Sequence, residues 1–119
     1  MESGYRSVYW MGSSRKDLQE FPEPVQDMVG YALFAVQSGK KPREAKPLHG
    51  FGSGVLEIVS NYDSDTYRAV YTVRLTKGIY VLHCFQKKSK HGIKTPQKEI
   101  DLIKQRLSQA IEQDRKIKE

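Results

Sequence analysis

Residues 83–96 carry the side chains of this chain that are best suited to chemistry. Four lysines fall within eight residues, at 87, 88, 90 and 94, and two histidines, His83 and His91, lie in the same segment. An apolar strand pattern over residues 79–85 leads directly into this cluster. Fixed cations at the end of a rigid strand can bind a phosphate and stabilise the charge that develops on it in a transition state. The segment therefore favours a polyphosphate ligand over a carboxylate metabolite.

The strands before this segment supply further charged candidates. Successive strand residues point to opposite faces, so only one of Lys87 and Lys88 can lie over a given site unless the strand twists or bulges. Arg68 and Arg74 occur in a strand with many apolar neighbours, and a guanidinium can bind a phosphate through two hydrogen bonds. Glu57, on the preceding strand, could pair with Arg68 or hold a lysine in place. The alternative for the two lysines is a solvated strand end and for the two arginines an exposed strand face, whereas Glu57 could form a cross-strand pair without any role in catalysis.

The histidines are expected to have different roles. His83 lies inside an apolar strand, which predicts a buried histidine with satisfied hydrogen bonds. His91 lies beside Gly92 in the basic segment, where an imidazole could transfer protons near neutral pH. With His49, the three histidines are too widely spaced, and Cys84 is too isolated, to predict a metal site. The absence of a phosphate-binding P-loop and of a Gly-x-Ser-x-Gly motif disfavours nucleoside triphosphatases and serine hydrolases.

The positive charge of the chain is regional. The formal net charge is +6, and residues 86–119 hold ten lysines and arginines against five acidic residues. This distribution favours a polyanion or an acidic protein as partner, with an ordinary solvated surface as the alternative. The length of 119 residues predicts one domain, residues 1–119. Because no membrane-spanning run, signal peptide pattern or possible internal disulfide is present, a cytoplasmic protein is expected.

The hydrophobic patterns predict an α+β domain with the element order β-α-α-β-β-β-α, in which an N-terminal strand and a helical hairpin pack on an antiparallel sheet. The predicted strands cover residues 5–10, 55–61, 67–75 and 79–85. The predicted helices run over residues 15–21, from 22–24 to the stop at Gly39, and from Thr95 and Pro96 to about residue 112. Prolines and glycines predict an irregular loop over 40–54, and the tail 113–119 is expected to fray.

The sequence HCFQKKSKHGIKTP at residues 83–96 resembles a segment of the RelE/HigB superfamily of toxins, in its phage-derived HigB-like branch. The shared elements are H-x-F-x-K-K and the T-P that opens the last helix, and the resemblance covers nearly the whole chain. It implies the RelE-like fold and the role of toxin in a type II toxin–antitoxin module. Members of this family are typically ribosome-dependent mRNA endoribonucleases (mRNA interferases) that inhibit translation.

The resemblance implies a reaction without a metal or other cofactor, because the 2′-hydroxyl of the RNA attacks the adjacent phosphate. The implied partners are a cognate antitoxin, expected to be a helix-turn-helix protein, and the ribosome with its mRNA. Operator DNA is implied as a partner only through the antitoxin complex, and no membrane is implied.

The resemblance also implies roles for individual residues. The implied catalytic residues are Arg68 and Lys87 for transition-state charge, and His91 or Lys94 for proton transfer. The implied RNA-binding residues are Lys46 and Lys88 for the backbone, Phe85 or Tyr71 for base stacking, and Glu57 of a Glu-Leu-Arg motif. Where that motif has arginine, however, this chain has Val59. A weakened or altered activity, a ParE-like gyrase-binding toxin, and a non-catalytic corepressor that binds antitoxin and DNA therefore stay open as alternatives.

Overall fold

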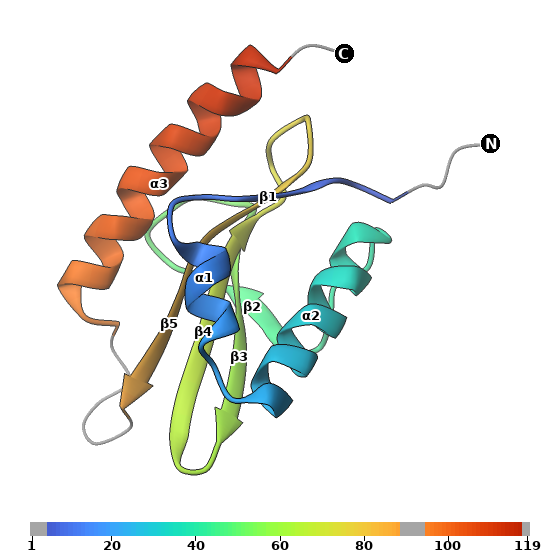
Figure 1. Cartoon of the computed structure of the whole chain (residues 1–119). Helices are drawn as coiled ribbons and strands as arrows, with labels where there is room; N and C mark the ends of the chain where they lie inside the picture. Colours follow the sequence, from blue (N-terminus) through green and yellow to red (C-terminus); the bar gives the residue numbers. More distant parts are fainter. Residues whose placement is uncertain (1–4, 89–94, 118–119) are drawn as a thin grey trace.

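A five-stranded mixed sheet forms the centre of the protein. The structure is a computed structural model that describes residues 5–88 and 95–117, with only the backbone of Lys88. The strands lie in the order β1-β5-β4-β3-β2 (Figure 1). Their bounds are β1 (Val8–Trp10), β2 (Ala45–Pro47), β3 (Val55–Tyr62), β4 (Asp65–Thr72) and β5 (Ile79–Lys88). β1 runs parallel to β5, and the other neighbouring pairs are antiparallel.

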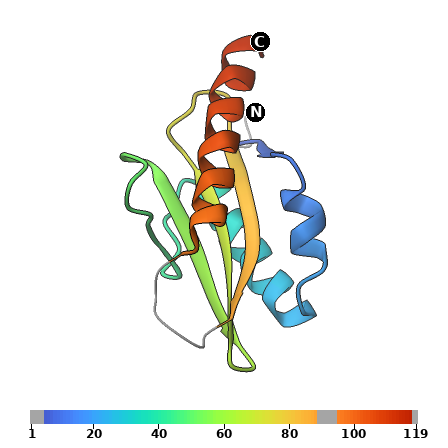
Figure 2. The same ribbon diagram turned by 90° about the vertical axis from the view of Figure 1, so that its left-hand side faces the viewer.

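Helices cover both faces of this sheet. Figure 2 shows α3 (Gln97–Lys116) on one face, with α1 (Ser14–Gln19) and α2 (Glu23–Gln37) on the other. Because side chains alternate along a strand, each face of the sheet has its own hydrophobic core. The core on the α2 face includes Ile58, Ala69, Tyr71, Val81 and Cys84. The core on the α3 face includes Val70, Tyr80, Leu82, Phe85 and Ile103.

The predicted helix between residues 22 and 39 is confirmed as α2. Its apolar stripe is buried against the sheet and consists of Val25, Val29, Ala32, Leu33 and Val36. Pro24 lies in the first turn, where its missing N–H costs no helical hydrogen bond. Gly39 follows the helix with a φ of 85°, a left-handed conformation that ends the helix and that glycine adopts without strain.

A β-bulge interrupts the pairing of β4 with β5. Val70 is paired with His83, but the next residue of β4, Tyr71, is paired with Val81. Leu82 is therefore an extra residue in β5. An extra residue shifts the alternation of the strand by one position, so that the side chains beyond it change faces.

The bulge decides which side chains of β5 face α3. Leu82 packs in the core under α3, and so does Phe85, three residues later, whereas Cys84 packs in the core under α2. Odd-numbered residues therefore face α3 beyond the bulge, and Lys87 shares this face with Phe85. In an unbroken strand, Gln86 would take this position and Lys87 would point toward the α2 face.

A buried arginine of α3 binds the bulge. One terminal nitrogen of Arg106, Nη1, donates hydrogen bonds to the carbonyl oxygen of Leu82 at 3.1 Å and to Nδ1 of His83 at 3.2 Å. Nη2 donates to Oγ of Ser13 at 3.1 Å. A Cβ atom on Gly12 would lie 2.6 to 2.8 Å from the guanidinium group, so only glycine leaves room for it. The bulge, the turn before α1 and the middle of α3 are thus fixed to one another.

Two predictions of the fold are wrong in part. Residues 40–54 contain the short strand β2, which pairs with β3, so the observed order is β-α-α-β-β-β-β-α. The last helix begins one residue later than predicted, with Pro96 rather than Thr95 at the N-cap, and it continues to Lys116. Residues 113–116 are thus helical rather than frayed, and Asp114 is buried against the turn that precedes β5.

The length and polarity of the helices bear on membrane insertion. Across residues 5–88 and 95–117, no helix is both long and apolar enough to cross a membrane.

Candidate active site

A cleft of about 680 Å³ lies on the α3 face, between β2, β3, β4 and the first turn of α3. Six of its nine lining residues are polar or charged, and the other three, Pro47, Leu48 and Ile100, are apolar. The polar lining residues are Lys46, His49, Glu57, Arg68, Thr95 and Gln97. Its volume lies within the range of sites that bind small molecules and nucleotides.

A buried ion pair forms one wall of the cleft. Nη1 of Arg68, on β4, lies 2.8 Å from Oε1 of Glu57, on β3, and confirms the predicted pairing. Only 9% of Arg68 and 5% of Glu57 are exposed. The carboxylate holds one end of the guanidinium, while Nε of Arg68 is buried and has no hydrogen-bond partner among the described residues. Because an unsatisfied buried donor is costly, a hydrogen bond from this nitrogen to an anion would be favourable.

Lys87 is a second cation close to Arg68 and Glu57, behind this wall rather than among the residues that line the cleft. It is 8% exposed, and its Nζ atom is buried without a hydrogen-bond partner in the described part of the chain. Burial lowers the pKa of Lys87, and the nearby charges of Arg68 and Lys46 lower it further, whereas Glu57 raises it in part. A phosphate beside Nζ would offset both the desolvation of the ammonium group and the repulsion between the cations.

Lys46 completes the basic side of the cleft at its mouth. It lies on β2 directly opposite Glu57 in the strand register, and its side chain is exposed. The three cations Lys46, Arg68 and Lys87 therefore come from three different strands and are brought to one site by the sheet. Such an arrangement can bind a phosphodiester and stabilise extra negative charge on it.

Val59 occupies the position where the resemblance would place an arginine. It is paired with Arg68 in the strand register and is half-buried. An arginine there would lie beside Arg68 on the same face. The cleft therefore has one cation fewer than the family pattern implies.

Two aromatic residues predicted to stack on RNA bases are not placed for that role. Tyr71 lies on the α2 face, away from the cleft, and is 1% exposed. Its burial raises its pKa to about 12. Phe85 faces α3 but is 7% exposed, with its ring stacked on His83 at a centroid distance of 4.9 Å. Both side chains serve the core, and the prediction that either stacks on RNA is wrong for this conformation.

The other predicted positions have mixed outcomes. His83 is buried and hydrogen-bonded, as predicted, with Nε2 lying 2.6 Å from Oε1 of Glu99. Arg74 donates hydrogen bonds to the carbonyl oxygens of Phe51 and Ser53, so it stabilises the loop before β3. The side chain of Lys88, together with His91 and Lys94, lies outside the described residues.

Sequence reasoning did not assign His49, Thr95 or Gln97 to the site, although all three line the cleft. Thr95 precedes the proline at the helix start, so the sequence predicted only a helix cap for it, and it predicted no role for Gln97. His49 is exposed in the loop between β2 and β3. The pairing of β2 with β3 brings this loop to the cleft, and β2 is the strand that the sequence did not predict.

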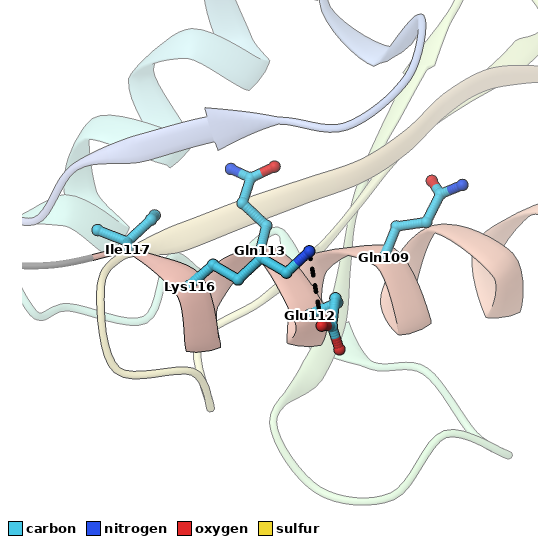
Figure 3. Close-up of a pocket in the computed structure, with 5 residues that line it drawn as sticks. All are labelled: Gln109, Glu112, Gln113, Lys116 and Ile117. Carbon is cyan, nitrogen blue, oxygen red and sulfur yellow. Dashed lines mark ion pairs between the residues drawn. The ribbon is translucent and has the colours of Figure 1, made fainter.

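A more open hollow of about 430 Å³ lies along the end of α3 (Figure 3). Its lining residues all come from the last turns of the helix and its end: Gln109, Glu112, Gln113, Lys116 and Ile117. Nζ of Lys116 lies 3.8 Å from Oε2 of Glu112, in an exposed pair within the helix. The charged side chains that line this hollow are exposed and paired with each other, and such pairs are weak. Among the described residues, the hollow has no buried unpaired donor of the kind found at the cleft.

Comparisons with known proteins agree with this architecture. The model of a family described as "Phage derived protein Gp49-like (DUF891)" matches residues 16–108. A chain from the crystal structure of the toxin–antitoxin complex RelBE2 of Mycobacterium tuberculosis is similar in structure, with 20% sequence identity and a TM-score of 0.50. The alignment covers 70% of this chain and 99% of that chain. At this identity the likeness concerns the fold, and it confirms the predicted RelE-like α+β fold. No curated protein matches the chain in sequence.

Proposed function

The chain belongs to the phage-derived Gp49-like family, and from this membership and the RelE-like fold we propose that it is the toxin of a type II toxin–antitoxin module that cleaves mRNA on the ribosome. The observation that carries this proposal is a pair of neighbouring buried donors, Nε of Arg68 in the lining of the cleft and Nζ of Lys87 close to it, which have no partner among the described residues. Two desolvated cations side by side are costly to the fold, which favours a role in binding and activating an anion.

The proposed reaction needs only the substrate's own nucleophile. The 2′-oxygen loses its proton and forms a bond to the adjacent phosphorus, and the bond from phosphorus to the 5′-oxygen breaks. The 5′-oxygen takes up a proton, which leaves a 2′,3′-cyclic phosphate and a 5′-hydroxyl. Arg68 and Lys87 are proposed to stabilise the additional charge on the phosphoryl oxygens, and Glu57 to hold Arg68 in position. Lys46 is proposed to bind the RNA backbone at the mouth of the cleft.

Partners follow from the same proposal. A cognate antitoxin, expected to be a helix-turn-helix protein, would neutralise the protein and connect it to operator DNA. The ribosome with its mRNA would be the target. The similar RelBE2 structure is that of a toxin–antitoxin complex, which supports an antitoxin partner for this chain.

Mapping of RNA 5′ ends after brief induction in cells tests the proposal. New cuts within translated messages are expected for the wild type and for the control Lys116→Met, whose lysine is exposed at the far end of α3. The cuts are expected to be lost in Arg68→Ala and in Lys87→Met. Growth arrest without cuts would contradict cleavage and point to a gyrase-binding toxin of the same fold. Absence of arrest would point to a non-catalytic corepressor, for which the missing cation at Val59 is the supporting observation.

A further inference from the structure

The outer face of α2 is apolar although it is exposed. Tyr31 is 79% exposed and Phe34 is 49% exposed. The ring of Tyr5 lies beside that of Phe34, with 5.2 Å between the ring centroids, and extends the apolar surface. Residues 28–39 contain no charged side chain, although 29% of the whole chain is charged. Because the exposed face of a surface helix normally carries charged and polar residues, a continuous apolar patch indicates a binding surface.

This patch belongs to a stripe on the side of α2 that faces away from the sheet. Exposed residues recur every three or four positions along the helix, at Glu23, Asp27, Gly30 with Tyr31, and Phe34. Because a helix completes one turn in about 3.6 residues, these positions lie on one side of it. α2 itself packs on the face of the sheet opposite to α3 and the cleft (Figure 2). The stripe is therefore separate from the candidate active site.

Gly30 lies at the centre of the stripe without an evident need for glycine in the fold. A Cβ atom on Gly30 would meet no atom within 4 Å, and the backbone there is not left-handed. Glycine in the interior of a helix lowers its stability relative to other residues. Neither packing nor backbone conformation in the described structure requires it at this position. A glycine does, however, let a second surface approach the helix closely.

Opposite charges mark the two ends of the stripe. Glu23 is exposed in the first turn of α2, and Lys40 and Lys41 are exposed shortly after the helix ends. None of the ion pairs within residues 5–88 and 95–117 involves these three side chains. A stripe that is acidic at one end, apolar in the middle and basic at the other end is complementary to itself when it is reversed.

We propose that α2 binds the same helix of a second copy of this chain, antiparallel to it, around a two-fold axis level with Ala32. Phe34 of each copy then lies over Gly30 of the other copy, because both are two positions from Ala32. Glu23 and Lys41 are each nine positions from Ala32, about 13 Å along the helix axis, so they meet at both ends of the contact. The two-fold symmetry makes each of these contacts twice.

The charge order of the stripe favours a second copy over a different protein. The antitoxin could also cover an apolar patch, but reversal of the same stripe supplies the matching charges at both ends without any further requirement. The clefts lie on the α3 faces, on the outer sides of such a dimer, and stay accessible. Dimerisation therefore does not depend on cleavage of RNA and can be tested without it.

Sedimentation equilibrium of the full chain over about 5–500 µM tests for this dimer. A reversible monomer–dimer equilibrium with a dissociation constant of about 10–100 µM is expected, because two helices make a smaller contact than a standard interface. Phe34→Gln removes the central aromatic ring and should raise the dissociation constant about tenfold or more. The matched control Tyr62→Gln removes a ring that is 41% exposed on β3 and should leave it unchanged.

Gly30→Gln separates a loss of the interface from a loss of the fold. Glutamine is a better helix former than glycine, and a side chain at this position meets nothing in the same molecule. The midpoint of thermal unfolding, measured on the dilute monomer, should therefore rise. The same side chain fills the space that Phe34 of the second copy occupies, so the dissociation constant should rise about tenfold. A protein that is more stable but associates less cannot have lost the interface by unfolding.

Exchange of the charges tests the antiparallel register. Glu23→Lys places like charges opposite each other, so at low ionic strength it should raise the dissociation constant about threefold or more. Lys41→Glu should have a similar effect. The double variant with both substitutions restores opposite charges at both ends, so its dissociation constant should return to near the wild-type value.

A chain that stays monomeric at about 500 µM would overturn the proposal and leave this face to a different protein. A dimer that is unaffected by Phe34→Gln and Gly30→Gln would also overturn it, because the contact would then lie on another surface. Failure of the double charge variant to restore association would refute the antiparallel pairing of the two helices.

Discussion

Replacement of Asp114 by asparagine should strongly destabilise the protein, although this residue lies three positions before the last described residue. The carboxylate of Asp114 is 7% exposed and joins the end of α3 to the turn before β5. Oδ2 accepts hydrogen bonds from the backbone N–H and the hydroxyl of Thr76, at 3.0 and 2.9 Å. Oδ1 accepts from the backbone N–H of Lys77 at 2.7 Å and from the hydroxyl of Tyr80 at 3.0 Å.

The size of the effect follows from these four donors. The asparagine side chain has the same shape, but its terminal nitrogen is a hydrogen-bond donor. Because each carboxylate oxygen accepts from two of the four donors, this nitrogen must face two donors instead of accepting from them. A hydroxyl can turn away, whereas a backbone N–H cannot, and a buried donor without an acceptor costs about 1–3 kcal/mol. With the loss of charge from the remaining hydrogen bonds, the free energy of unfolding should fall by about 2–4 kcal/mol. For a domain of this size the midpoint of thermal unfolding should fall by about 10 °C.

Thermal and urea denaturation of Asp114→Asn and of Glu112→Gln measure this effect. Glu112 lies two residues earlier on the same helix, half exposed, with weak ion pairs to Arg115 at 3.5 Å and to Lys116 at 3.8 Å. Its replacement makes the same charge change and should alter the free energy of unfolding by less than about 0.5 kcal/mol. Equal effects of the two substitutions would refute the reasoning.

The pH dependence gives a second check on Asp114. Burial by itself raises the pKa of this carboxyl, but the hydrogen bonds from Thr76, Lys77 and Tyr80 outweigh it, so that the pKa lies below its usual value of 3.8. A carboxyl with a lowered pKa in the folded state stabilises fully above the unfolded value and loses this stabilisation as the pH falls through the folded value. The difference between wild type and Asp114→Asn should therefore be constant at neutral pH and should shrink below about pH 4.

Three further predictions concern β5 and the arginine that binds it. Lys87→Met should keep or raise the free energy of unfolding, because burial lowers the pKa of Lys87. In urea denaturation, the stability of the wild type should rise with pH just below the usual pKa of lysine, where the unfolded state binds more protons than the folded state. This rise should be absent in the variant. Burial raises the pKa of the Cys84 thiol to about 12, so a thiol reagent at pH 8 should react only after unfolding, and rapid labelling of the native protein would contradict the structure. Arg106→Met should lower the free energy of unfolding by about 2–4 kcal/mol in urea denaturation, because the carbonyl of Leu82 and Nδ1 of His83 lose their donor; a loss below about 1 kcal/mol would show that the bulge does not depend on it.

Patterns local to one element predicted much of this fold. The helical spacing of apolar residues predicted α2, and the buried stripe includes Val25 and Val36 at its two ends. Alternation between short turns predicted β3, β4 and β5 within a few residues. The polar His83 in an apolar strand was correctly interpreted as a buried histidine, because an imidazole at such a position needs partners in the core.

Features that depend on distant partners could not be predicted in the same way. β2 has three residues and ends with Pro47, so its own sequence indicates a loop, and only its pairing with β3 makes it a strand. The last turn of α3 is polar and was expected to fray, yet Asp114 is fixed by donors that lie 34 to 38 positions earlier in the chain. In both cases tertiary contacts override a weak local preference.

The candidate site depends on one further feature that a sequence pattern does not show. Strict alternation from Leu82 would place Gln86 and Lys88 on the α3 face, and Lys87 on the other. The bulge reverses this order, and the cation that reaches Arg68 is Lys87. Because Arg106 binds the bulge through the carbonyl of Leu82, a residue of α3 supports the register that places Lys87 on the α3 face near Arg68. The lysine pair in the sequence therefore could not show which of the two lysines lies near Arg68, since this depends on a contact with a residue more than twenty positions later in the chain.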